Sequence, residues 1–78
     1  MSISPQAVRE YLLARDPEFQ RLASEHNQYE KQLDQITTQP YLNSEDLLLE
    51  IELKKRKLRV KDEMEMLISQ QRREASRR

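Results

Sequence analysis

The chain has 78 residues with no cysteine and no glycine, and its 14 basic side chains balance 14 acidic ones. A chain of this length forms at most one domain with a small core. The lack of cysteine excludes disulfides and thiolate metal sites, and the lack of glycine excludes the glycine-rich loops that bind nucleotide phosphates. Half of the residues are Ala, Glu, Lys, Leu or Arg, a composition typical of long helices and coiled coils.

Two Ser/Asp-Pro pairs mark helix starts near the N-terminus. Ser4 can cap free backbone amides and Pro5 needs no hydrogen-bond donor in the first turn, so residues 1–15 are predicted as a short N-terminal helix or extension. Asp16 and Pro17 repeat this signal and predict the start of a second helix. The alternative is one continuous helix that is kinked at Pro17.

The predicted helix over residues 17–37 has a heptad pattern. Large side chains alternate at steps of three and four, which places them on one stripe facing another helix. These residues are Phe19, Leu22, His26, Tyr29, Leu33 and Ile36. The same register continued backwards reaches Leu12 and Val8. His26 is interpreted as a packing residue of this stripe rather than a metal ligand, because a metal site needs three or four converging ligands.

Residues 38–43 are predicted as a turn, because a β-branched pair and a proline interrupt the pattern. Tyr41 is expected to close the end of the core there. Asn43 together with Asp46 resembles a helix cap, and Ser44 is the alternative cap. The last helix is predicted over 44–71, and the short connection makes the two long helices an antiparallel hairpin of coiled-coil type.

The predicted last helix carries two apolar stripes on nearly opposite faces. The longer stripe is assigned to the hairpin seam, although the reverse assignment stays open: Leu49, Leu53, Val60, Met64 and Leu67. The shorter stripe is assigned to an oligomer face: Leu47, Ile51 and Leu58. Because a hairpin covers only one stripe, the sequence predicts an all-α homo-oligomer, with a dimer of hairpins in a four-helix bundle favoured.

Cations gather in two places and form the predicted electrostatic surface. The first group is Lys54, Lys55, Arg56, Lys57, Arg59 and Lys61, and the second, in a basic tail over residues 72–78, is Arg72, Arg73, Arg77 and Arg78. Glu50 and Glu52 precede cations by four residues, which predicts a surface of helical ion pairs. Nucleic-acid binding is the alternative; it is not favoured, because the two halves of the chain carry formal charges of only −2 and +2.

No pattern in the chain resembles a catalytic centre, because the acidic and hydroxyl residues lack an organising base or loop. We therefore expect a non-enzymatic helical interaction or scaffold module, without cofactor or metal, that associates with itself and binds another macromolecule, most plausibly a protein. The longest apolar run is three leucines, too short for a membrane span. Without a signal-peptide pattern, the expected location is cytoplasmic.

The sequence resembles the small bacterial YdcH-like proteins, a family of unknown function. The similarity covers about residues 16–68, and its most distinctive part is the Leu-Lys-Lys-x-Lys-Leu-x-x-Lys-Asp stretch at 53–62. Further matching segments are Asp16-Pro17-Glu18-Phe19, the positions of Leu22, His26, Leu33 and Ile36, and Tyr41-Leu42. The resemblance implies a cytoplasmic helical hairpin with no established activity. The segment before Asp16 and the arginine tail lie outside it.

Overall fold

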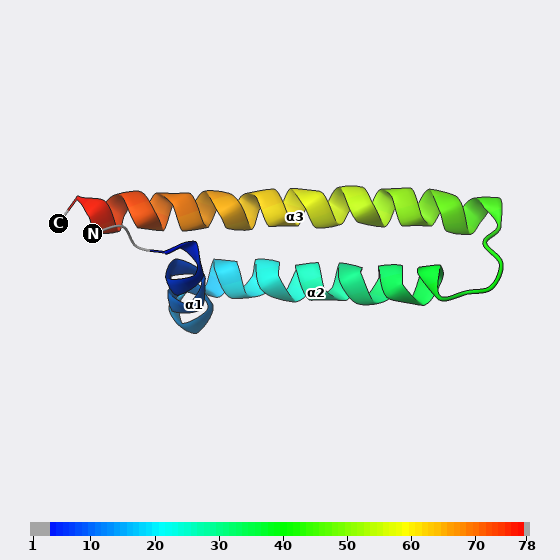
Figure 1. Cartoon of the computed structure of the whole chain (residues 1–78), viewed down its shortest axis with the longest axis horizontal. Coiled ribbons are helices and arrows are strands. Elements are labelled where there is room, and N and C mark those ends of the chain that lie inside the picture. The colour runs from blue at the N-terminus through cyan, green and yellow to red at the C-terminus, as the bar shows by residue number, and fades with distance from the viewer. Residues whose placement is uncertain (1–3, 78) are drawn as a thin grey trace.

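The computed structural model of the protein describes residues 4–77, and this part of the chain is an all-α hairpin. The helices are α1 (Pro5–Arg15), α2 (Pro17–Thr37) and α3 (Ser44–Ser76). α2 and α3 run antiparallel, and α1 lies across their open end in contact with both (Figure 1). The predicted hairpin with a short N-terminal helix is confirmed, whereas its association into a bundle stays a prediction.

The first two helices begin at polar side chains that cap their free amides. The Ser4 hydroxyl accepts a hydrogen bond from the Ala7 amide at 3.1 Å. The Asp16 carboxylate accepts from the amides of Glu18 and Phe19 at 2.9 and 3.4 Å. A proline follows each cap at the first helical position, where its missing N–H costs nothing. Each of these two helix starts is therefore specified locally, by Ser4-Pro5 for α1 and by Asp16-Pro17 for α2.

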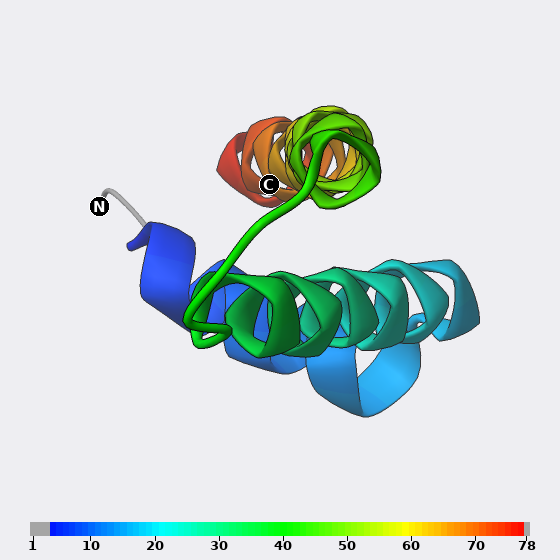
Figure 2. The same ribbon diagram turned by 90° about the vertical axis from the view of Figure 1, so that its right-hand side faces the viewer.

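α3 begins with a reciprocal cap rather than with Ser44. The Asn43 side chain accepts from the Asp46 amide at 2.8 Å, and the Asn43 amide donates to the Asp46 carboxylate at 3.3 Å. This arrangement satisfies two backbone donors at once and fixes the first turn of α3. The connection from α2 is only residues 38–43, so α3 returns directly alongside α2 (Figure 2).

A single residue separates α1 from α2, so the alternative of one kinked helix is wrong. Asp16 has an extended backbone, with φ −101° and ψ 110°. Its amide donates to the Leu12 carbonyl at 2.8 Å, which ends α1. The Gln20 side chain donates to the Leu13 carbonyl at 2.8 Å. These bonds hold α1 folded across the end of the hairpin rather than in line with α2 (Figure 1).

The buried apolar residues form two clusters along the hairpin. The cluster at the open end, which we call the α1 cluster, joins all three helices: Val8, Leu12, Phe19, Leu22, Val60, Met64 and Ile68. The cluster near the connection, the turn cluster, has three buried residues: Leu33, Ile36 and Leu53. Tyr29 is half-buried and packs against both clusters. Phe19 is fully buried and is the largest side chain of the core.

The packing of three residues differs from the prediction. Leu49 was assigned to the hairpin seam but is 49% exposed, because it lies at the border of the seam, where it lines an open hollow with Gln32 and Ile36 of α2. Ile68, which the sequence analysis did not assign, is buried under α1. Tyr41 does not close the core: its side chain is 88% exposed, and the half-buried Leu42 packs on the turn cluster instead.

α3 extends beyond its predicted end near Gln71 to Ser76. The predicted basic tail over 72–78 is thus helical up to Ser76, and Arg77 is its C-cap. The added turns lie beside α1, where Gln71 and Ala75 are half-buried. Contact with α1 and the absence of a helix-breaking residue together explain the continuation. Arg78 lies outside the described residues.

Candidate functional site

The outer face of α3, turned away from α2, carries a row of exposed apolar side chains. Leu47, Ile51 and Leu58 are 48%, 53% and 58% exposed, and Leu48 beside them is 67% exposed. At about 100° per residue the first three fall within one narrow stripe of the helix. We call Leu47, Ile51 and Leu58 the outer row. An exposed row of apolar side chains is a candidate site of interaction.

The outer row is exposed because the hairpin seam occupies the other side of α3. The seam side holds Leu53, Val60, Met64 and Ile68, which are all buried against α2 or α1. Apart from Leu49, the longer stripe therefore packs against α2 and α1, and the shorter stripe is exposed. Leu67 is half-buried against the α1 cluster.

The α2 residues predicted for the seam face α3 to different degrees. Phe19, Leu22, Leu33 and Ile36 are buried. His26 is half-buried at the edge, where its Nε2 lies 4.0 Å from the Glu30 carboxylate. Within the described residues, no three His, Asp or Glu side chains are grouped so that they could hold a metal ion.

Charges are segregated along the first half of α3. Residues 45–52 contain four carboxylates and no cation, and residues 54–61 contain six cations and no carboxylate. Two of the expected ion pairs form within the helix: Lys54 with Glu50 at 2.9 Å and Arg56 with Glu52 at 3.0 Å. A third pair joins the two long helices, with Lys57 Nζ 3.8 Å from the Glu30 carboxylate. The remaining three are exposed: Lys55, Arg59 and Lys61.

The C-terminal arginines border a separate shallow hollow of about 530 Å³ on the last turns of α3. Its lining consists of two serines and three arginines: Ser69, Arg72, Arg73, Ser76 and Arg77. No carboxylate is part of this lining. The hollow therefore combines cationic and hydroxyl donors, the groups that contact phosphate in nucleic-acid complexes.

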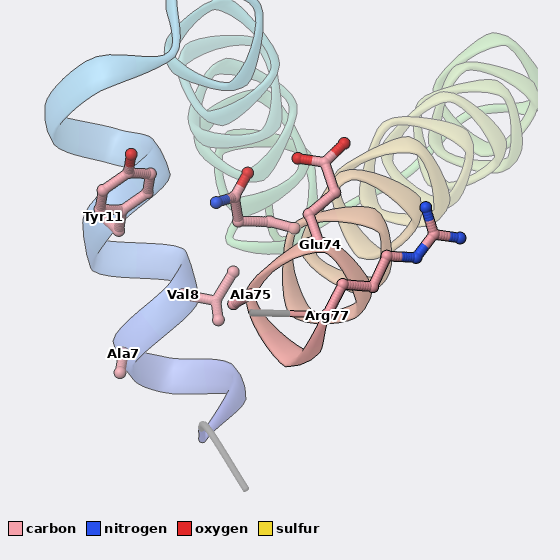
Figure 3. A pocket seen from close by; sticks show the side chains of 7 residues that line it. Ala7, Val8, Tyr11, Glu74, Ala75 and Arg77 are labelled. Carbon is pink, nitrogen blue, oxygen red and sulfur yellow. The ribbon is translucent and has the colours of Figure 1, made fainter. Parts of the chain in front are cut away.

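A second hollow, of about 600 Å³, lies between α1 and the end of α3 (Figure 3). Val8 of α1 points toward Ala75 of α3, and Tyr11 lies farther along the same face of α1, while the charged ends of Glu74 and Arg77 extend away from α1 (Figure 3). The Arg15 guanidinium covers the Tyr11 ring at 4.8 Å from its centroid. The floor of this hollow is thus apolar, and it belongs to the contact that holds α1 in place.

Comparison with known proteins gives one match. The protein family described as "Protein of unknown function (DUF465)" matches residues 19–68. These residues span most of α2, the connection, and α3 as far as Ile68. No curated protein and no solved structure matches the chain. Among the helices that the structure describes, none has both the length and the apolar character needed to cross a bilayer.

Proposed function

This chain belongs to the DUF465 family of proteins of unknown function, and we propose that it is a non-enzymatic helical module that associates with itself through the outer row of α3. The joined hairpins would act as a scaffold that presents charged helix surface to a further macromolecule, favoured to be a protein. The observation that carries this proposal is the exposure of Leu47, Ile51 and Leu58 on one stripe of a well-capped helix. The four-helix bundle and the cytoplasmic location expected from the sequence are parts of the same proposal.

The size of the outer row sets the expected strength of association. Full burial of one such side chain contributes about 1.5–3 kcal/mol, and each is already about half covered, so six side chains from two copies contribute about 5–9 kcal/mol. Loss of translational and rotational freedom opposes this with about 4–15 kcal/mol. We therefore expect a dimer of modest affinity that exchanges with monomer rather than an obligate dimer.

Sedimentation equilibrium over about 1 μM to 1 mM, which corresponds to association free energies of about −8 to −4 kcal/mol, tests the proposal. The wild-type chain should pass from monomer to dimer within this range. Ile51→Ser should keep it monomeric, because a polar group would replace the centre of the row. Met66→Ser is the matched control: Met66 is 62% exposed on the same helix but lies outside the row, so dimerisation should persist. A wild-type monomer at all concentrations would refute self-association.

Nucleic-acid binding is the second candidate function, and the hollow lined by Arg72, Arg73 and Arg77 supports it. If it operates, a short RNA or DNA duplex should shift in a native gel, and the shift should weaken steeply with salt. Replacing these three arginines by Gln should abolish the shift. Replacing Arg9, Arg15 and Lys31 by Gln removes the same charge elsewhere and should preserve it. Absence of any shift near physiological salt would reject this candidate.

A further inference from the structure

We infer that the outer row binds a second copy of this chain in an antiparallel orientation, with Leu47 of each copy against Leu58 of the other. The inference rests on the proposed self-association and adds its partner geometry. The two-fold axis would then cross α3 between Glu52 and Leu53. Two hairpins would be joined through their α3 helices.

The spacing of the outer row fits such a helix pair. Exposed residues follow one another along the outer face at steps of three and four: Ser44, Leu47, Ile51, Lys54, Leu58 and Lys61. This is the repeat of a coiled-coil seam. In the antiparallel register the leucines at 47 and 58 form two layers. Ile51 faces the aliphatic stem of Lys54 in the two layers between them, with the ammonium group at the rim. All three apolar residues of the row are then covered.

The charge pattern of α3 selects the orientation. An antiparallel pair lays the acidic block 45–52 of each copy along the basic block 54–61 of the other. In this register Glu50 and Lys57 flank the row on the same side and face each other across the interface. A parallel pair would instead align six cations with six cations, and like charges placed side by side oppose association. The surface is complementary to itself, so a second copy supplies both blocks without another protein.

Unpaired charges are available for this contact. Among residues 4–77, Lys55 and Lys61 have no carboxylate within 4.0 Å, and both are exposed beside the outer row. A second copy in the antiparallel register brings these groups near opposite charge. Added salt should therefore weaken the dimer moderately without dissociating it completely, since the leucine layers do not depend on ionic strength.

Disulfide trapping tests the orientation directly, because the natural chain has no cysteine. Ser44→Cys and Lys61→Cys are made as two separate variants, which leave the outer row intact. In the antiparallel register these positions face each other at both ends of the row. Two copies of the same variant would instead hold their thiols about 25 Å apart along the helix, given a rise of about 1.5 Å per residue. A disulfide requires Cα atoms closer than about 7 Å.

The two variants are mixed and oxidised by dissolved oxygen with a copper catalyst, and the products are weighed by mass spectrometry. The mixed disulfide should exceed either homodisulfide by about tenfold, because only the mixed pair meets the distance limit. A guanidinium-denatured mixture is the control and should give near-statistical products. Ser44→Cys linking to itself as readily as to its partner variant would establish a parallel pair and overturn the inference.

The same samples separate failure of this inference from failure of self-association. If the wild-type chain sediments as a dimer but no mixed disulfide accumulates, the antiparallel register is wrong and the proposed function stands. If the wild-type chain sediments as a monomer throughout, both are refuted. A dimer that yields the mixed disulfide, and that Ile51→Ser dissociates, supports both.

Discussion

At the open end of the hairpin, α1 lies across α2 and α3 and seven side chains are buried together, whereas the turn end buries three. The difference comes from α1, which supplies Val8 and Leu12 to the first cluster and has no counterpart at the other end. At the turn end α2 stops at Thr37, and the opening turns of α3 present leucines to solvent.

The two ends differ in how completely the apolar surface of the hairpin is covered. Two helices cover one stripe of each other, and any further apolar surface requires a third element. The chain provides that element itself at the open end. At the turn end it does not, and there the outer row begins. The contrast between an internal cover at one end and none at the other is the physical reason for the interaction surface that we propose on the first half of α3.

The largest expected effect is at the open end. Phe19→Ala should lower the free energy of unfolding by about 3–5 kcal/mol, because the side chain is fully buried where the three helices meet. Urea denaturation followed by circular dichroism measures this, at a concentration below dimerisation. Phe19→Leu serves as the control and should cost much less. A loss for Phe19→Ala no greater than that for Leu53→Ala would break the contrast between the two ends.

A smaller loss is expected at the turn end. Leu53→Ala removes the only α3 residue that is buried in the turn cluster, and the unfolding free energy should fall by about 2–3 kcal/mol. The value belongs at the low end for leucine because a cluster of three residues can partly collapse around the gap. Hydrogen exchange adds a local readout. The amides near Ile36 should lose protection, while those near Leu22 should change little.

The helix caps should give effects of about 1 kcal/mol, a typical value for removal of a capping side chain. Asp16→Ala removes two hydrogen bonds from the start of α2, whereas Asn43→Ala removes one from the start of α3. We expect the Asp16 variant to be the less stable of the two in thermal denaturation. Equal melting temperatures would show that the Asp16 cap stabilises the protein no more than the Asn43 cap does.

The smallest effect is expected on the exposed face. Leu48→Ser changes a side chain that is 67% exposed, so the stability of the monomer should change by less than about 0.5 kcal/mol. Denaturation at low concentration measures this, and Leu53→Ala in the same helix gives the buried reference. A loss comparable with the buried reference would mean that the turn end is covered within the single chain.

Local signals made much of this architecture predictable from the sequence. Two proline-containing caps, a six-position heptad and a short connection specify the order, ends and pairing of the helices without long-range information. The misassignments within α3 share one cause. The burial of Leu49, Ile68 and the last turns of α3 depends on how the other helices lie against α3, and periodicity within one helix does not reveal where the seam begins or that α1 folds back.

The exposed apolar face of α3 was predictable to a similar extent. Two opposed apolar stripes on one helix can be read directly, and the exposed one is the shorter. That the shorter stripe is the exposed one follows only from the packing of the longer stripe against α2 and α1. The arginine hollow was less accessible to sequence reasoning. Its residues were assigned to a tail, but the helix that continues to Ser76 arranges them along one surface.

The junction at Asp16 makes the two connections of the chain unequal in their tolerance of added length. The same residue ends one helix through its amide and starts the next through its carboxylate. One amino acid inserted after it would separate the Asp16 cap from Pro17 and displace α2 relative to α1, and Val8 and Leu12 would lose their packing with Phe19. An insertion in the exposed 38–43 segment would only lengthen a loop. The α1–α2 junction therefore tolerates little added length, whereas the α2–α3 connection tolerates more.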